Sequence, residues 1–231
     1  MSGPRPCPHG LCDGSGFLYD EEANTARPCR CRPQRISRAR ARSLSAVIPK
    51  RYREVSLDRA PLADLAPDIK RPVQDFVRRI DENLDAGRGL CFLGDVGTGK
   101  TTLAMFVSKM ALEAGRSVAI YSLPRLLTTI RTTFNDDSAQ SHAELLEKLG
   151  AVDLLHLDDL GAENSTPWVL EELYSIVNTR YEEEKSVVVT TNLGRDELRE
   201  QIGERTVSRL GEMCIDVPVF GHDRRSEFHA A

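Results

Sequence analysis

The segment Gly94-Asp95-Val96-Gly97-Thr98-Gly99-Lys100-Thr101 restricts the possible folds of this chain more than any other segment. It matches the pattern G-x-x-x-x-G-K-[ST], and it lies between a short apolar run at 90–93 and a helical pattern over 101–114. Glycines at these positions let the backbone wrap around a phosphate, while the amides and the helix N-terminus present positive dipoles to it. We therefore predict a strand, a phosphate-binding loop and a helix in direct succession.

The last two residues of this loop indicate which ligand it binds. The Lys100 ammonium is expected to reach the β- and γ-phosphates of a nucleotide, and the Thr101 hydroxyl to bind Mg²⁺. This arrangement is typical of a P-loop NTPase, so we predict ATP and Mg²⁺ as cofactors. The residues predicted to contact the nucleotide are Gly94, Asp95, Val96, Gly97, Thr98, Gly99, Lys100, Thr101 and Thr102.

Short apolar runs alternate with helical segments through the rest of the chain. Strand-like runs at 90–93, 118–121, 154–157, 187–190 and 214–219 are separated by helical patterns over 101–114, 126–134, 143–149 and 168–181 and by two short helices. An amphipathic helix over 73–86 precedes them and ends at Gly87. This alternation indicates parallel βαβ units, so the predicted fold class is α/β with one doubly wound, five-stranded parallel sheet.

Two of the predicted strands end in polar residues that suit ATP hydrolysis. The run at 154–157 ends in Asp158-Asp159, and we predict that Asp158 holds Mg²⁺ while Asp159 is the general base. The run at 187–190 is followed by Thr191-Asn192. Asn192 is predicted to orient the attacking water, as the polar tip of the extra strand in ASCE-type ATPases does. His156 is interpreted as a core residue. The alternative for Asp158-Asp159 is a solvated strand end, and the alternative for Asn192 is a turn residue without a catalytic role.

Arg205 and Arg209 lie four residues apart and so share one helix face. One of them could act across a subunit boundary as an arginine finger, which stabilises charge on the transferring phosphoryl group. Surface arginines without a catalytic role are the alternative.

Four cysteines gather near the N-terminus as Cys7-x4-Cys12 and Cys29-x-Cys31, with 16 residues between the pairs. Four thiolates suit tetrahedral Zn²⁺ and leave no open coordination position, so we predict a structural zinc site in which His9 could replace one sulfur. Disulfides are the alternative, and a reducing compartment disfavours them. Cys91 and Cys214 lie in apolar runs and are expected to be inert core residues.

Composition places the chain among globular proteins. Of its 231 residues, 40% are hydrophobic and 29% are charged, which excludes a mostly disordered chain. No apolar run approaches the ~20 residues that cross a bilayer, and the N-terminus lacks an apolar stretch of signal-peptide type. We therefore expect a cytoplasmic protein with no membrane partner.

Charge and cysteine content suggest three regions. Residues 1–35 form the predicted zinc module, 36–60 a basic linker and 61–231 the ATPase domain. Between residues 27 and 53 there are ten Lys or Arg and no Asp or Glu. Such a segment either contacts a nucleic-acid backbone or is a solvated linker, and the sequence does not separate these two readings.

Together these motifs resemble the AAA+ helicase loaders of bacteria and their phages, of the DnaC/DnaI type. The similarity covers most of residues 47–225. The resemblance rests on residues 94–102, on 153–163, on Trp168 with Leu173-Tyr174, on 178–181, on 190–193 and on 203–210.

This resemblance implies an ATPase that binds a DnaB-type replicative helicase, assists its placement on single-stranded DNA and assembles as an ATP-dependent homo-oligomer. It implies that Arg205 is the finger acting in trans, that Arg209 lies near the nucleotide, and that no helical lid follows the sheet. Single-stranded DNA contacts are implied at Arg131, Phe134, Thr166 and Trp168. By analogy, the zinc module grips the helicase.

Three other functions compete with the loader. An IstB-type transposition helper has nearly the same ATPase core but serves a transposase. A zinc adaptor would use ATP as an assembly ligand without hydrolysing it. A metabolite kinase would need a substrate pocket and a lid, for which the sequence offers no residues.

Overall fold

The computed structural model describes residues 7–20, 25–32, 48–135, 139–162 and 165–223. Its centre is a five-stranded, fully parallel sheet with the strand order β4-β5-β6-β3-β7. The strands are β3 (Gly89–Leu93), β4 (Val118–Ser122), β5 (Leu154–Asp158), β6 (Ser186–Thr191) and β7 (Cys214–Pro218). Strand β6, which precedes Asn192, lies between β3 and β5 and is thus inserted between the strand of the phosphate loop and the strand that ends in the acid pair.

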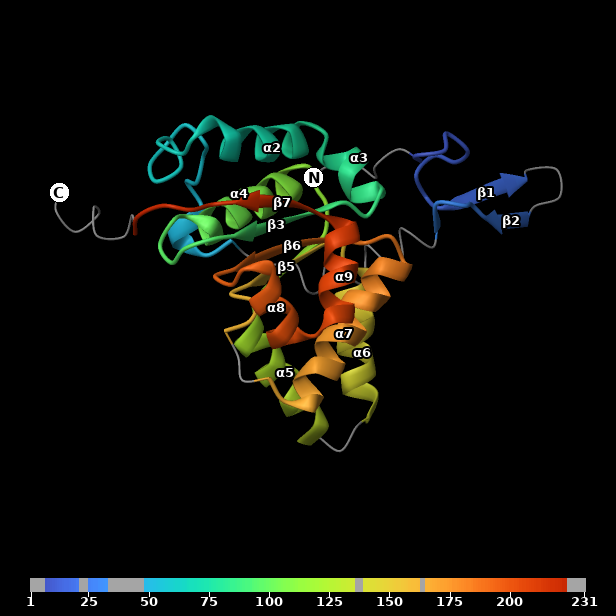
Figure 1. Cartoon of the computed structure of the whole chain (residues 1–231). Coiled ribbons are helices and arrows are strands. Elements are labelled where there is room, and N and C mark those ends of the chain that lie inside the picture. Colours follow the sequence, from blue (N-terminus) through green and yellow to red (C-terminus); the bar gives the residue numbers. More distant parts are fainter. Residues whose placement is uncertain (1–6, 21–24, 33–47, 136–138, 163–164, 224–231) are drawn as a thin grey trace.

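Helices cover both faces of the sheet (Figure 1). One face carries α2 (Pro67–Arg78), α3 (Ile80–Asp85) and α4 (Lys100–Glu113). The other carries α5 (Leu123–Asn135), α6 (Ala139–Ala151), α7 (Pro167–Glu182), α8 (Arg195–Ile202) and α9 (Glu204–Met213). The predicted α/β class with a doubly wound sheet is therefore confirmed. After β7 the structure describes residues 219–223, which are not helical.

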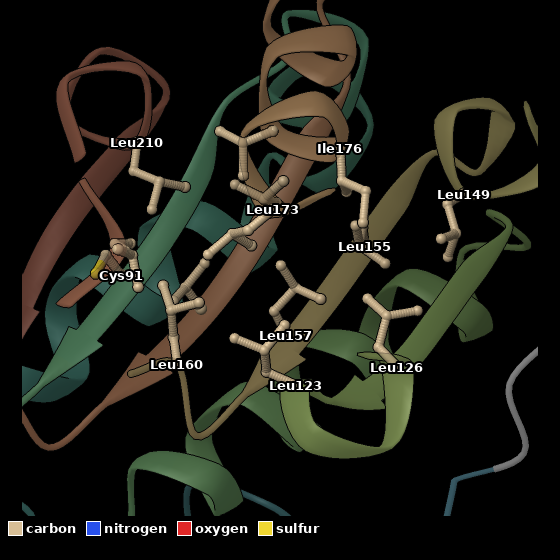
Figure 2. Close-up of a cluster of buried hydrophobic side chains, with 14 of the residues drawn as sticks. Cys91, Leu123, Leu126, Leu149, Leu155, Leu157, Leu160, Leu173, Ile176 and Leu210 are labelled. Atoms are coloured by element: carbon tan, nitrogen blue, oxygen red, sulfur yellow. The ribbon is translucent and has the colours of Figure 1, made fainter. Parts of the chain in front are cut away.

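The two faces bury separate hydrophobic clusters because successive strand residues point to opposite sides. Leu90 and Phe92 of β3 pack with α2 and α4, whereas Cys91 packs with α7 and α9 on the other side. Figure 2 shows the second cluster, in which Leu155 of β5 meets side chains from α5, α6 and α7. These near-continuous apolar strands are typical of a parallel sheet covered on both faces.

The single helix predicted over 73–86 is wrong, because the structure breaks it into α2 and α3 at Arg79, whose φ and ψ are −112° and 38°. In a continuous helix the carbonyl of Phe76 would accept the N–H of Ile80. Here it accepts Nδ2 of Asn83 over 2.9 Å. The buried asparagine side chain thus replaces the bond that the break removes.

Arg180 of α7 is fully buried and ties several chain segments together. Its guanidinium donates to the carbonyls of Leu149 (2.6 Å), Val152 (3.0 Å) and Ser186 (2.6 Å). These acceptors close the end of α6, the turn before β5 and the start of β6. Arg180 therefore stabilises the ends of two central strands that face away from the phosphate loop.

The folded domain around the parallel sheet begins earlier than the predicted boundary at residue 61. Val55 and Leu57 are buried in the cluster that contains Phe92 and Leu103, and Lys109 Nζ donates to the Val55 carbonyl over 3.1 Å. Residues 36–47 of the predicted basic linker lie outside the described residues. From residue 48 onward the linker is therefore anchored to the core through Val55 and Leu57, while most of its other side chains are exposed.

Cys91 and Cys214 lie in the core, as predicted. Burial raises the pKa of the Cys91 thiol to about 12, which keeps it protonated and unreactive. Among the helices that the structure describes, none has the length and apolar character needed to cross a bilayer.

Candidate nucleotide and metal sites

A cavity of about 360 Å³ adjoins the phosphate loop. It brings together predicted residues from three separate segments, namely Lys100 of the loop, Asp159 after β5 and Asn192 after β6. These segments meet because the carboxyl ends of parallel strands lie at one edge of the sheet. The complete lining is Arg51, Tyr52, Pro61, Gly97, Gly99, Lys100, Thr101, Thr102, Asp159 and Asn192.

Lys100 is almost fully buried at the start of α4. Its Nζ donates to the carbonyl of Gly94 over 2.8 Å and to that of Asp95. The remaining predicted loop residues, Gly94, Asp95, Val96 and Thr98, lie outside the cavity lining, and Thr98 Oγ1 donates to the Asp95 carbonyl over 2.9 Å. The loop is thus closed by its own hydrogen bonds.

Residues that follow β7 return over this loop. The N–H of Gly221 donates to Asp95 Oδ2 over 3.2 Å. Gly97 has a φ of +79°, and a Cβ placed on it would lie 2.0 Å from Oδ1 of Asp223. The backbone conformation therefore favours glycine here, whereas the exposed Asp223 side chain can move aside for a Cβ.

Asp158 is positioned by three side chains. Its Oδ1 accepts the Thr190 hydroxyl over 2.7 Å and lies 3.8 Å from His156 Nε2. Burial alone would raise the pKa of Asp158, but the contacts to His156 and Thr190, with the Thr101 hydroxyl, outweigh it and hold the pKa below its usual range. The carboxylate and the Thr101 hydroxyl are hard oxygen donors in contact with one another, so this pair fits Mg²⁺.

Asp159 and Asn192 are both exposed at the cavity. Asp159 has a left-handed backbone with a φ of +58°, and its N–H donates to Thr190 Oγ1 over 2.9 Å. This conformation is uncommon for residues other than glycine. The predicted base and the predicted water-orienting residue therefore line the same cavity as the lysine.

His156 is buried within β5, which confirms its interpretation as a core residue. Its Nδ1 lies 3.0 Å from the hydroxyl of Ser108 in α4. The histidine therefore links the helix that follows the phosphate loop to the strand that ends in the acid pair.

Arg205 and Arg209 lie on α9, and neither belongs to the cavity lining. Arg209 is half-buried, with its guanidinium 4.2 Å from the Tyr181 ring centroid and its Nε 3.2 Å from Asn178 Oδ1. Arg205 is exposed. The structure thus does not bring Arg209 to the cavity of its own chain and leaves Arg205 accessible.

Two of the predicted DNA-contact residues meet. The Arg131 guanidinium lies 4.7 Å from the ring centroid of Trp168, so α5 and the start of α7 are joined by a cation–π contact. Thr166 is exposed and caps α7, because its side chain accepts the N–H of Val169 over 3.3 Å. The side chain of Phe134 lies outside the described residues.

The N-terminal cysteines form a compact group. A hairpin of β1 (Phe17–Asp20) and β2 (Thr25–Pro28) returns the chain, so that Cys29 donates its N–H to Gly16 over 2.9 Å and lies beside the first pair. All four Sγ atoms lie within 4.8 Å of one another, with 3.8 Å between Cys7 and Cys29 and 3.6 Å between Cys12 and Cys31. Tetrahedral zinc with Zn–S bonds of ~2.3 Å places sulfurs about 3.8 Å apart, so the group fits the metal.

The surroundings of these thiols also suit a metal. Burial raises the pKa of Cys7, but hydrogen bonds from the backbone amides of Leu11, Cys12 and His9 outweigh it and lower that pKa to about 6. Burial and the neighbouring thiols raise the pKa of Cys31 to about 12. The His9 side chain is exposed and does not belong to the group, so among the described residues four sulfurs are the candidate ligands.

Arg51, Tyr52 and Pro61 also line the cavity, although no motif in the sequence predicts them there. Lys50–Tyr52 forms a short 3₁₀ helix, η1, and the Arg51 guanidinium lies 4.9 Å from the Tyr52 ring centroid at the cavity wall. The available signal was an aromatic residue directly after Pro49-Lys50-Arg51. The high basic charge of the surrounding segment is typical of a linker and therefore does not indicate a cavity wall.

A protein-family model described as IstB-like ATP binding protein matches residues 74–216. A replicative helicase loader DnaC from Buchnera aphidicola subsp. Baizongia pistaciae is 31% identical over 137 residues, which are 59% of this chain and 54% of that protein. The chain therefore spans about half the length of the curated relatives that it matches.

Two solved structures extend the similarity to the fold. A crystal structure of the DnaC helicase loader has a TM-score of 0.65 and 26% identity, with 74% of this chain and 99% of that chain covered. A crystal structure of DnaI has a TM-score of 0.63 and 24% identity, with 80% and 100% covered. At 24% identity, the second similarity shows the fold alone.

Proposed function

The chain belongs to the IstB-like ATP binding protein family, and we propose that it is an ATP-hydrolysing loader that recruits a replicative hexameric helicase to single-stranded DNA. The observation that carries this proposal is the meeting of Lys100, Asp159 and Asn192 at one cavity. Within the family, the structural similarity to the DnaC helicase loader favours loading over other uses of the same ATPase core.

The residues in and beside the cavity have different proposed roles in ATP hydrolysis. Lys100 and the amides of the phosphate loop bind the nucleotide phosphates. Asp158 and Thr101 hold Mg²⁺, which neutralises charge on the β- and γ-phosphates when it is bound. Asn192 orients a water molecule, and Asp159 accepts its proton.

Arg205 is the proposed finger for the nucleotide of a neighbouring subunit. Its exposure on α9 supports this role, because a finger acting in trans must lie on a surface that a second copy can cover. Hydrolysis then depends on assembly. This assigns ATP a role in forming the homo-oligomer as well as in its turnover.

The N-terminal module is the proposed helicase-binding part. Its four sulfurs suit a structural zinc ion, which would hold a segment too small to build a core of its own. Arg131 and Trp168 are the proposed single-stranded DNA contacts, since an aromatic ring beside a cation binds bases without reading their sequence.

The test is complex formation with the replicative helicase of the same cell, measured by light scattering after size exclusion, with and without Mg²⁺-ATP. We expect a complex with the unmodified chain and none with Cys29→Ser, Cys31→Ser. That variant must still bind ATP, which separates loss of the module from unfolding of the ATPase core. Absence of a complex under every nucleotide condition would sink the helicase assignment.

The family description itself favours one alternative, an IstB-type transposition helper. In that case the chain would bind a transposase and its target DNA and would form no complex with the helicase. A zinc adaptor that uses ATP as an assembly ligand is tested separately by phosphate release. Steady release that single-stranded DNA stimulates and Asp159→Ala abolishes would exclude the adaptor.

A further inference from the structure

Thr190, at the end of β6, makes hydrogen bonds to three consecutive residues that end and follow β5. Its Oγ1 donates to Asp158 Oδ1 over 2.7 Å and accepts the N–H of Asp159 over 2.9 Å. Its carbonyl accepts the N–H of Leu160 over 2.8 Å. Because Thr190 is 1% exposed, water does not compete for these bonds.

The sheet register explains why Thr190 reaches the acid pair. Strands β5 and β6 are parallel neighbours with Leu157 opposite Val189. The next residues on the two strands, Asp158 and Thr190, therefore point to the same face and stand side by side. The apolar residues before them fix this register, since a slip by one residue would turn each core side chain to the opposite face.

The chemistry of a hydroxyl fixes the direction of both side-chain bonds. An ionised carboxylate accepts and a backbone N–H donates. The single hydroxyl proton of Thr190 must therefore go to Asp158, while its oxygen receives the Asp159 amide. One hydroxyl thus orients the first carboxylate and stabilises the left-handed backbone that turns Asp159 to the cavity.

His156 faces the same oxygen of Asp158. Its Nε2 lies 3.8 Å from Oδ1, and Ser108 fixes the ring through Nδ1 at 3.0 Å. Both neighbours thus approach the same carboxylate oxygen.

We propose that Thr190 is a positioning residue of this site, whose hydroxyl sets Asp158 for Mg²⁺ and Asp159 for the attacking water, with His156 as a second restraint on Asp158. Thr190 lies outside the cavity lining, so it acts through the two acids rather than on the nucleotide. This inference rests on the proposed ATPase function.

The test uses Thr190→Val, which keeps the shape and removes the hydroxyl, and Thr190→Ser, which keeps the hydroxyl. The matched control is Ser186→Ala, because it removes a buried hydroxyl from the other end of β6. The readout is the Mg²⁺ concentration that half-saturates binding of a fluorescent, non-hydrolysable ATP analogue. Phosphate release then gives kcat and KM for each variant, and thermal unfolding checks the fold.

For Thr190→Val we expect the half-saturating Mg²⁺ concentration to rise about tenfold, because a charge-assisted hydrogen bond is lost. Its kcat is expected to fall at least about tenfold with little change in KM. Thr190→Ser and Ser186→Ala are expected to stay within about twofold of the unmodified chain. If Thr190→Val does not fold, Thr190→Ala replaces it.

Unchanged Mg²⁺ dependence and kcat in Thr190→Val would overturn the inference, as would a serine variant that behaves like the valine variant. An unmodified chain that binds the analogue without hydrolysing ATP would contradict the hydrolysis in the proposed function, while the Mg²⁺ dependence would still decide the role of Thr190. A chain that does not bind the analogue would overturn both.

Discussion

The Arg131 guanidinium lies 4.7 Å from the centroid of the Trp168 ring, and this contact joins the exposed side of α5 to the first turn of α7. The arginine is exposed and the tryptophan is half-buried. A cation placed over an aromatic ring holds that ring in one orientation. The pair therefore forms a surface platform of one aromatic ring and one cation at the junction of α5 and α7.

We expect Trp168→Ala to weaken single-stranded DNA binding about tenfold, because the loss of one base-stacking ring costs this order of affinity. The chain contains one tryptophan, so its fluorescence reports on this position directly and is expected to change when DNA is added. Arg125→Ala, an exposed arginine on the same helix, is the control for loss of charge. An unchanged affinity of Trp168→Ala for single-stranded DNA would show that this platform does not contact the DNA.

The arginine finger can be tested by mixing two inactive variants. Lys100→Ala lacks the phosphate-binding lysine, and Arg205→Ala lacks the proposed finger. If the finger acts in trans, an equal mixture is expected to recover about a quarter of the unmodified phosphate release, since one site in four combines both intact residues. Arg199→Ala, at an exposed arginine of α8, serves as the surface control. A mixture that stays inactive would contradict action in trans.

Tyr52 is expected to contribute to nucleotide affinity rather than to chemistry. Its ring lines the cavity beside the phosphate-loop residues, where an aromatic ring contributes binding through its contact area. Tyr52→Ala should therefore raise KM for ATP about tenfold and leave kcat unchanged. Arg53→Ala, an exposed neighbour, should change neither value. An equal fall in kcat would place Tyr52 among the groups that act in the transition state.

Zinc removal should expose a defined set of thiols. We expect about one zinc ion per chain, bound by the four clustered cysteines. A strong chelator should release it and make four of the six cysteines reactive toward a colorimetric thiol reagent, leaving the buried Cys91 and Cys214 protected. Full thiol reactivity before chelation would exclude a metal site here.

Arg180→Met is expected to destabilise the ATPase core by about 3–5 kcal/mol, measured by urea unfolding. The substitution leaves several buried carbonyls without a donor and removes a cation near Asp153. Arg71→Met, at an exposed position of α2, should change the free energy of unfolding by less than about 0.5 kcal/mol. A loss of similar size in both variants would contradict the structural role of Arg180.

The sequence predicts the convergence of Lys100, Asp159 and Asn192 because local pattern and position in the sheet determine where these residues lie. The glycines of the phosphate loop identify it in the sequence. Asp159 and Asn192 each follow an apolar strand, and parallel strands all end at the same edge of the sheet. Their convergence follows from parallel topology. The four clustered cysteines were found in the same way, because residue type and spacing together define a metal group.

The parts missed depend on contacts between distant segments. Tyr52 belongs to the cavity because Val55 and Leu57 anchor its segment in the core, and the charge of that segment concealed this. Thr190 became significant when the register of β5 and β6 was known. The break at Arg79 needed the Asn83 side chain to satisfy a carbonyl, which helical periodicity does not reveal.

The strand order also determines which strands can pair while the chain is being synthesised. Strand β3 carries the phosphate loop, yet its two partners are β6 and β7, which follow it by about a hundred residues or more. A nascent chain that has emerged only as far as α7 therefore holds the loop on a strand with both edges unpaired. The backbone groups along both edges of β3 stay without strand partners until β6 leaves the ribosome, so the time taken to translate residues 94–186 sets how long these edges are open to pairing with other chains.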